Sequence, residues 1–269
     1  MSQFLEPVVL FRRGNEEEYE FEAAKKYFHV IENRTLCVNN MVICRYSALP
    51  FYAELERDLK YQNCFMINTF KQHRWIADFE YYETVKEYTA ESWNEYEFEQ
   101  CQYDGPFVVK GKTNSRKWAW KRSMFAPDKK TARHMGNELL TDSMIGEQGV
   151  VFRKYIPLKE LEIGINQLPF SNEWRFFYYK TTRLCYGYYW SVALDETKEK
   201  ANIDETALSF ADKIAETVSS HVNFFVLDIA EKQDGGWILI EINDGQMSGL
   251  SEIPSDCLYK ELAIQVNKS

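Results

Sequence analysis

The sequence predicts an α+β protein with more than one subdomain. The chain has 269 residues, enough for two or three subdomains with a real core. Strand-like runs alternate with helical patterns over the first hundred residues, an order that is typical of a parallel sheet. Residues 224–246 instead hold two apolar, β-rich runs around a tight turn, which predicts an antiparallel hairpin.

Composition and charge exclude several classes of protein. The chain contains 18 Phe, 17 Tyr and 7 Trp but only 12 Gly and 7 Pro, so disordered and fibrous classes do not fit. A net charge of −9 argues against a general nucleic-acid binder, although a local basic groove stays open. No run approaches the roughly 18 apolar residues of a membrane span, and the N-terminus lacks a signal-peptide pattern. Six cysteines without CxxC spacing indicate reduced thiols, and we expect a cytoplasmic protein.

Residues 1–103 predict a small α/β domain. Asn68 and Thr69 are expected to cap a helix that runs through Ile76, and Pro50 suits the first turn of an earlier helix. Residues 83–102 are rich in glutamate and predict an acidic, solvated connector. Strands are expected at residues 8–11, 36–38, 41–44 and 64–67.

Residues 104–157 predict two strands separated by a basic stretch and a helix. Lys110 lies near the end of the first strand, and the second strand spans residues 149–156. In residues 111–130, lysines and arginines alternate with Trp118 and Trp120. This stretch either grips a nucleic-acid backbone and stacks bases or forms a twisted hairpin with solvated lysines.

Residues 158–269 contain two predicted hairpins. The first turns near Thr181 and places Glu173 and Arg175 on one face. In the second, Asp234-Gly235 favours a two-residue turn. That turn places Asp228 directly opposite Glu241.

Asp228, Glu241 and Asn243 share one face of the second hairpin and suggest a metal site. Facing carboxylates have Cβ atoms roughly 5 Å apart and repel each other, so a cation between them is favoured. Mg²⁺ takes oxygen ligands of this kind. The alternative is a surface hairpin whose polar side chains face water, but a strand apolar on both faces is usually buried.

An aspartate that ends one strand, followed thirteen residues later by Glu-x-Asn, resembles the metal end of the ATP-grasp superfamily. The resemblance implies two α+β subdomains that hold ATP with Mg²⁺ or Mn²⁺, preceded by a small α/β domain. It divides the chain into an N-terminal domain (1–103), a small subdomain (104–157) and a C-terminal subdomain with the metal site (158–269). Most members are carboxylate–amine or carboxylate–thiol ligases that work through an acyl-phosphate.

The resemblance also assigns nucleotide-binding residues. It places Lys110 on the phosphates and offers a third interpretation of the basic stretch, a mobile loop that covers the phosphates with Lys117. Glu160 falls at the ribose position, with Glu162 as a close rival. The hinge that pairs with adenine comprises Arg153, Lys154, Tyr155 and Ile156.

The sequence departs from the family pattern at three positions. A lysine expected after the helix near Ile76 is replaced by Phe79, and the glutamate at the start of the hinge by Arg153. Val226 stands where many ligases have an arginine that stabilises the transferring phosphate. Arg175 is the candidate replacement, unless it pairs with Glu173 or another acidic neighbour.

The implied reaction is ATP-dependent amide formation between a carboxylate and an amine, small molecules or peptides, with release of ADP and phosphate. The loop after Asn243 is expected to face the substrate through Gln246 and Ser248, and its backbone N–H groups can hold an anion. Two other functions stay open: a nucleic-acid ligase or modifying enzyme, and a nucleotide-binding module without turnover.

Overall fold

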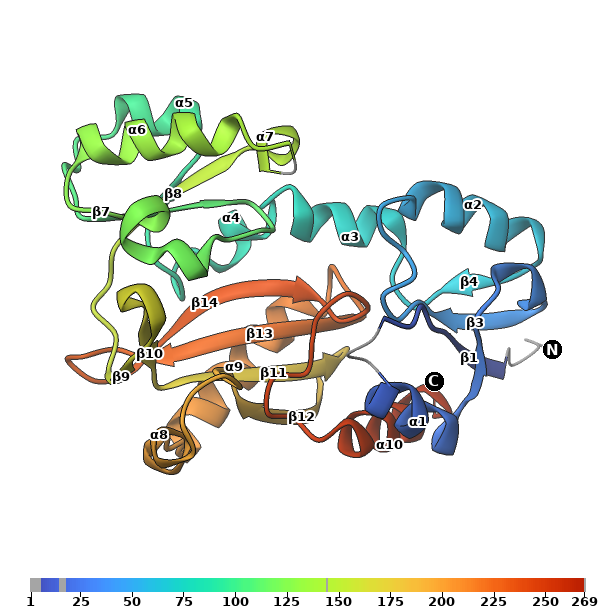
Figure 1. Cartoon of the computed structure of the whole chain (residues 1–269). Coiled ribbons are helices and arrows are strands. Elements are labelled where there is room, and N and C mark those ends of the chain that lie inside the picture. The colour runs from blue at the N-terminus through green and yellow to red at the C-terminus, as the bar shows by residue number, and fades with distance from the viewer. Residues whose placement is uncertain (1–5, 15–17, 144, 269) are drawn as a thin grey trace.

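The structure is a computed structural model that describes residues 6–14, 18–143 and 145–268. Figure 1 shows three bodies: the N-terminal domain, a small subdomain above, and a large subdomain below. Within the described residues, each body contains one four-stranded sheet, and a two-stranded sheet of β9 (Glu160–Ile163) and β10 (Pro169–Ser171) lies beside them. The predicted α+β class is confirmed.

The N-terminal sheet is parallel, as predicted. Its strand order is β2-β1-β3-β4, and α1 (Glu18–Tyr27), α2 (Tyr52–Tyr61) and α3 (Phe70–Ala77) accompany it. Thr69 caps α3 as expected, because its side chain and that of Gln72 bond each other's backbone N–H groups. The predicted strand at 36–38 is wrong, since a 3₁₀ turn ends at Leu36. The strands are β1 (Glu6–Leu10), β2 (His29–Ile31), β3 (Asn40–Ile43) and β4 (Phe65–Met66).

The small subdomain is an antiparallel sheet covered by helices on one side. Its order is β5-β8-β6-β7, and α6 (Lys129–Leu140) supplies most of the covering core. The acidic connector is more than a solvated face, because it contains α4 (Tyr81–Val85), β5 and α5, and the Glu95 carboxylate accepts a bond from the Val150 N–H at 2.8 Å. β5 therefore joins a sheet whose other strands follow the predicted boundary at residue 103, and the boundaries stay predictions. The remaining elements are β5 (Ser92–Trp93), α5 (Glu95–Gln100), β6 (Phe107–Gly111), β7 (Phe125–Ala126), α7 (Ile145–Gln148) and β8 (Val150–Lys154).

The large subdomain is an antiparallel sheet of order β12-β11-β13-β14. One face packs on α9 (Glu205–Val218), and the other packs on α10 (Ser255–Val266) and the N-terminal domain. Figure 1 shows α1 and α10 side by side, so the two ends of the chain meet in one core. The other elements are β11 (Glu173–Tyr179), β12 (Thr182–Tyr188), α8 (Asp195–Lys200), β13 (Phe224–Glu231) and β14 (Trp237–Asp244).

The β13–β14 hairpin has the predicted register at its metal end but not the predicted turn. Lys232 donates its N–H to the Gly236 carbonyl at 2.9 Å, so the loop has three residues, with Gly235 at φ +94°. A bulge between Asp228 and Ile229 in the register then absorbs the extra residue, Ile240, on the opposite strand. Asp228 consequently still faces Glu241, while Ile238, Ile240 and Ile242 do not form the single apolar face that strict alternation predicts.

Candidate active site

A cavity between the small and large subdomains collects most of the predicted nucleotide-binding residues. It contains about 970 Å³ of empty space up to its open mouth. Its wall combines apolar side chains such as Ile238 and Met124 with charged groups at one end. This combination suits an elongated ligand with an apolar ring at one end and anionic groups at the other. The predicted residues that line the cavity are Lys110, Lys117, Arg153, Lys154, Tyr155, Ile156, Glu160 and Glu241.

Arg175, Asp228 and Glu241 form a row across three adjacent strands. The register pairs Arg175 with Asp228 and Asp228 with Glu241. Arg175 donates to both oxygens of the fully buried Asp228, at 2.8 and 2.7 Å, and a third bond reaches the Gly249 carbonyl at 2.8 Å. Such a two-pronged pair is strong and geometrically specific. Arg175 therefore pairs with Asp228 rather than with Glu173.

Lys110 forms an ion pair with Glu241 across the two subdomains. Both side chains are largely buried. Burial raises the pKa of Glu241, but the nearby Lys110 and Lys117 ammonium groups outweigh it and hold that pKa well below its ordinary value. The repulsion between the facing carboxylates is therefore relieved by two cationic side chains, Arg175 on Asp228 and Lys110 on Glu241.

Asn243 completes the predicted metal set at the end of β14. Its Nδ2 donates to Asp228 at 3.4 Å, a long bond, so the two predicted ligands lie close together. The described residues contain no group of three or more His, Cys, Asp or Glu arranged to hold a metal. The predicted set thus consists of two carboxylates and one amide oxygen, all of them hard donors that suit Mg²⁺.

The basic stretch folds as short helical turns, not as the twisted hairpin. Lys117 begins a 3₁₀ turn (Lys117–Ala119) that runs into a π-helix (Trp120–Met124). The Lys117 ammonium donates to the Tyr189 hydroxyl and lies 4.1 Å from the Tyr189 ring centroid. Burial lowers the pKa of Lys117, but Tyr189, Glu173 and Glu241 together raise it above its ordinary value. Lys117 is therefore a fixed positive charge on the cavity wall, while Trp118 is 66 % exposed.

Arg153 supports the bulged strand with its side chain. Its guanidinium donates to the Ile240 carbonyl and to the Thr89 hydroxyl, each at 2.5 Å. The segment before β5 adds a further link, since the Leu239 N–H donates to the Tyr88 carbonyl at 2.8 Å. The side chain at the start of the predicted hinge thus holds the bulge that sets the register of Glu241.

The structure separates the two carboxylates proposed for the ribose position. Glu160 lines the cavity and pairs with Ser171 in the β9–β10 sheet. Glu162 accepts a long bond, 3.4 Å, from the Leu194 N–H and does not line the cavity. Glu160 is therefore the better placed of the two.

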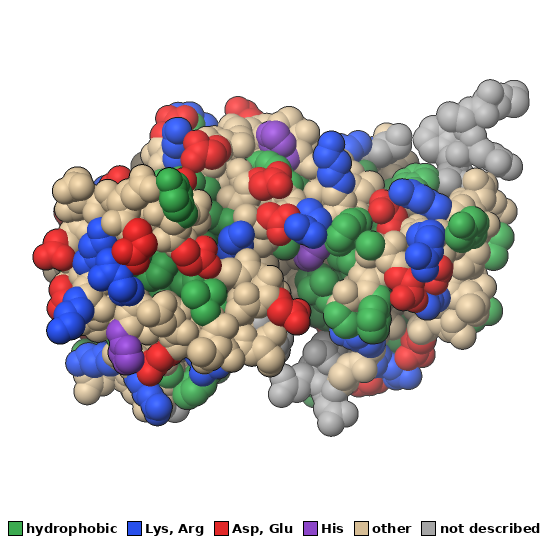
Figure 2. All heavy atoms as spheres, turned by 90° about the horizontal axis from the view of Figure 1, so that it is seen from above, with side chains coloured by type: hydrophobic (Ala, Val, Ile, Leu, Met, Phe, Trp, Pro, Cys, Tyr) green, Lys and Arg blue, Asp and Glu red, His purple; other side chains and the backbone are tan. Residues whose placement is uncertain are grey.

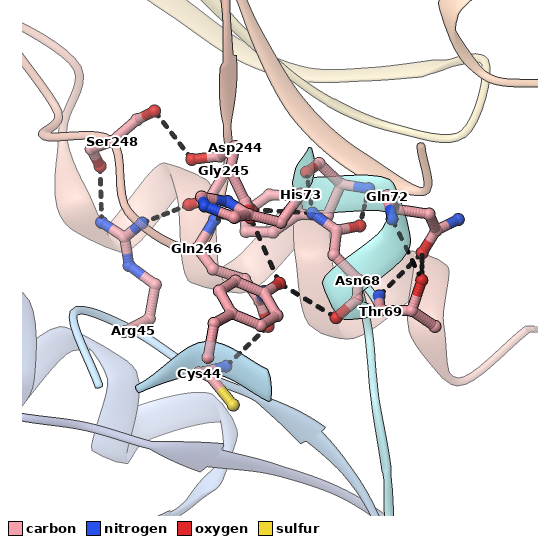
Figure 3. Close-up of polar contacts among 12 residues, drawn as sticks. Cys44, Arg45, Asn68, Thr69, Gln72, His73, Asp244, Gly245, Gln246 and Ser248 are labelled. Atoms are coloured by element: carbon pink, nitrogen blue, oxygen red, sulfur yellow. Dashed lines mark hydrogen bonds and ion pairs between the residues drawn. The ribbon is translucent and has the colours of Figure 1, made fainter. Parts of the chain in front are cut away.

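Gln246 and Ser248 belong to a buried polar cluster that joins the N-terminal domain to β14 (Figure 3). Gln246 accepts a bond from the Cys44 N–H at 3.0 Å and is fully buried, and Ser248 donates to the Asp244 carbonyl at 2.8 Å. Both side chains hold the structure together, and their predicted contact with a substrate stays a prediction.

Asp244 is the centre of this cluster, and the sequence alone did not single it out. Its carboxylate accepts bonds from the Asn68 amide at 2.8 Å and the Gln246 N–H at 2.9 Å. Tyr52 donates to it at 3.2 Å, and the ring Nδ1 of His73 lies 3.1 Å away. The cluster fixes the end of β14 against the N-terminal sheet, and a polar residue after Glu-x-Asn was its only signal in the sequence.

Glu173 is a second site residue whose role the sequence did not reveal. Its side chain lines the cavity, is 3 % exposed, and receives a long bond, 3.3 Å, from the Ser171 hydroxyl. Burial raises its pKa to about 7, although the Lys117 charge lowers it. The sequence showed only that Glu173 shares a face with Arg175.

The family model that matches this chain describes an ATP-grasp domain, the third family of its clade, and covers residues 97–262. The chain belongs to the ATP-grasp family. The predicted family is thus confirmed, and the matched range includes β6, the hinge and all four strands of the large subdomain. The curated proteins contain no match that adds a relative by sequence.

Solved ATP-grasp structures share the fold over the whole chain. D-cycloserine synthetase DcsG is 12 % identical, covers 97 % of this chain and 99 % of its own, and has a TM-score of 0.61. A RimK domain ATP-grasp protein from Sphaerobacter thermophilus is 14 % identical over 95 % and 98 % of the two chains, with a TM-score of 0.57. D-alanyl-alanine synthetase A from Vibrio cholerae is 11 % identical over 99 % of each chain, also at 0.57. At these identities the likeness shows the ATP-grasp fold.

The surface bears on the other functions left open by the sequence. In Figure 2, acidic and basic side chains are interspersed on the face seen from above. Such mixing, together with the net charge of −9, does not favour non-specific binding to a nucleic-acid backbone. Among the described residues, no helix combines the length and apolar character needed to span a membrane.

Proposed function

We propose that the protein is an ATP-dependent ligase that joins a carboxylate to an amine through an acyl-phosphate. The observation that carries the proposal is the row Arg175–Asp228–Glu241, joined by Lys110, at the charged end of the cavity. This row concentrates two cationic side chains and two carboxylates where the phosphates of a nucleotide bound along the cavity would lie. The ATP-grasp family and fold support ATP as the ligand.

The donor set fits Mg²⁺ or Mn²⁺. Asp228, Glu241 and Asn243 would hold the ion, which supplies neutralisation of phosphate charge when it is bound. A structure of the ligase PsnB contains Mg and ADP on the same fold, at 10 % identity and a TM-score of 0.57. Each carboxylate here is paired with a cationic side chain, so binding of the ion exchanges these partners.

Lys110 and Arg175 are the residues proposed to move from carboxylate to phosphate. Both are donors without acceptor capacity, and both stay cationic at neutral pH. When a metal ion takes their place on Glu241 and Asp228, their N–H groups become available to phosphate oxygens. They would then stabilise charge that develops during phosphoryl transfer.

In the proposed reaction, an oxygen of the substrate carboxylate attacks the γ-phosphorus and the bond to the β-phosphate oxygen breaks, which releases ADP. The amine nitrogen then attacks the acyl carbon, and phosphate leaves with the electron pair of the broken C–O bond. Lys117, held by Tyr189, is proposed to bind the phosphates from the small-subdomain side. Lys154, Tyr155 and Ile156 would contact the base, and Gln246 and Ser248 would orient the substrate loop.

Product analysis tests the proposal. The wild-type protein is incubated with Mg²⁺ and ATP against pools of amino acids, peptides and oligonucleotides, and the products are followed by ³¹P NMR. Peptides are included because PsnB has been solved with a precursor peptide. We expect ADP and orthophosphate, and added hydroxylamine should trap the acyl-phosphate as a hydroxamate.

Three outcomes contradict the proposal. Pyrophosphate as main product, with oligonucleotides as the required partner and a steep salt dependence, would indicate a nucleic-acid enzyme. A stable phosphorylated acceptor without hydroxamate would indicate a kinase. ATP binding without ADP release from any pool would indicate a nucleotide-binding module.

A further inference from the structure

Three buried side-chain atoms in the cavity wall have no hydrogen-bond partner among the described residues. They are Nε of Arg153, Oε1 of Glu173 and Nε1 of Trp190. Buried polar groups in folded proteins are nearly always hydrogen-bonded, so each exception needs an explanation. The other nitrogens of Arg153 bond Ile240 and Thr89. Glu173 and Trp190 therefore stand out as an acceptor and a donor that face the cavity wall without partners.

The two residues are brought together by β11 and the end of β12. The Tyr189 N–H donates to the Glu173 carbonyl at 2.9 Å, which places the following residue, Trp190, beside Glu173. Lys117 approaches both, since its ammonium lies 5.2 Å from the Trp190 ring centroid and its charge acts on Glu173. The Trp190 ring is fixed by stacking on Phe170 at 4.9 Å. One patch of wall thus offers an acceptor and a donor on rigid supports.

A hydroxyl group is the chemical match for such a pair, because it donates and accepts at the same time. Phosphate oxygens of a nucleotide only accept, and a carboxylate repels them. The amino group of adenine donates, but it is a poor acceptor. The sugar hydroxyls are therefore the groups of ATP that satisfy both atoms.

The position of Glu173 along its strand agrees with this match. Ser171, two residues earlier, pairs with Glu160 in the β9–β10 sheet. Arg175, two residues later, pairs with Asp228 in the phosphate row. Glu173 lies between these two levels, where the sugar connects the base to the phosphates.

We propose that Glu173 and Trp190 bind a sugar hydroxyl of the nucleotide, with Oε1 of Glu173 accepting its hydrogen and Nε1 of Trp190 donating to its oxygen. The inference rests on the proposed ATP site and makes the protein selective for ribonucleotides. Glu160 lies nearer the cavity end opposite the phosphates and is not the discriminating carboxylate. Ionised Glu173 is the strongest acceptor, and its pKa of about 7 sets pH 8 as the condition for the test.

Calorimetric titration at pH 8 with Mg²⁺ compares ATP, 2′-deoxy-ATP and 3′-deoxy-ATP. The wild-type protein should bind one deoxy analogue about tenfold or more weakly than ATP, the usual effect of losing a hydrogen bond to a charged group. Glu173→Met and Trp190→Phe should bring this ratio close to one, while the affinity for that deoxy analogue stays within about twofold. Glu173→Gln keeps one acceptor oxygen and should give an intermediate ratio. Glu162→Gln, outside the cavity, is the control and should keep the wild-type ratio.

Two results overturn the inference. One is equal binding of ATP and both analogues by the wild-type protein. The other is a ratio that survives Glu173→Met but disappears in Glu160→Gln, which would assign the hydroxyl to Glu160. Failure of the wild-type protein to bind ATP at all would instead overturn the proposed function, and the two failures are thus distinguished.

Discussion

At the scale of single residues, the charged end of the cavity is a set of exchangeable partners. Lys110 pairs with Glu241 and Arg175 pairs with Asp228, and all four side chains are largely buried. A buried pair is weak evidence for stability in itself, but removing one partner leaves an uncompensated charge. The same pairs therefore link protein stability to nucleotide binding.

Lys110→Met should lower the free energy of unfolding of the nucleotide-free protein by about 3–5 kcal/mol, because Glu241 then loses its direct partner in the interior. Lys110→Met combined with Glu241→Gln should recover most of that loss. Both variants should lose Mg²⁺-dependent ATP affinity. Urea denaturation and calorimetry measure the two effects. Additive losses of stability in the double variant would show that the pair does not couple.

Glu173 should make stability depend on pH. Its pKa in the folded protein is raised to about 7, so the folded state binds a proton more tightly than the unfolded chain. Stability contributed by the protonated form is present below the unfolded pKa and is lost as pH rises to about 7, a loss of about 3 kcal/mol. The stability of Glu173→Gln relative to wild type should therefore be greater at pH 8 than at pH 5. An equal difference at both pH values, measured by urea denaturation with Glu162→Gln as control, would contradict this.

At the scale of elements, β14 is held from both sides. Arg153 bonds the Ile240 carbonyl at the bulge, and Asp244 ends the strand within the cluster shared with Asn68 (Figure 3). Between these two anchors lie Glu241 and Asn243. The position of the proposed metal ligands thus depends on contacts from segments far away in the sequence.

Asn68→Ala tests the second anchor. The Asn68 side chain is fully buried and bonds the Phe224 carbonyl at 2.6 Å, the Phe224 N–H at 2.9 Å and Asp244. Its removal leaves these buried groups unpaired, so we expect a loss of about 2–4 kcal/mol in the free energy of unfolding, at about 1–3 kcal/mol for each unpaired group. Gln100→Ala, on the exposed surface of α5, is the control and should change stability little. Equal losses in both variants would show that the cluster is not an anchor.

At the scale of the whole molecule, the cavity unites two subdomains that have separate sheets. Lys110 and Lys117 come from the small subdomain, and Glu241 and Glu173 come from the large one. A ligand that contacts both walls binds only the folded, assembled protein. Nucleotide binding should therefore stabilise the molecule as a whole.

MgATP at a hundred times its Kd should raise the free energy of unfolding by about 2.7 kcal/mol. A thermal scan should show a higher Tm with ATP and Mg²⁺ than with ATP and EDTA, because the proposed exchange of partners on Glu241 and Asp228 requires the ion. Glu241→Ala should remove the difference between the two conditions. An identical Tm with and without Mg²⁺ in the wild-type protein would contradict the assignment of the metal set.

The sequence by itself determined the fold class, the family and the register that faces Asp228 with Glu241. These depend on alternation along strands, on turn residues and on a spacing within twenty residues, all of which are local properties. Even the wrong turn left the register intact, because a bulge compensated for the longer loop. Only the tertiary structure decided which groups neutralise the two carboxylates, that Glu173 is isolated beside Trp190, and that Asp244 is bound by Asn68. Those relations join residues up to 176 positions apart, and they are set by how the sheets and helices pack, which no local pattern encodes.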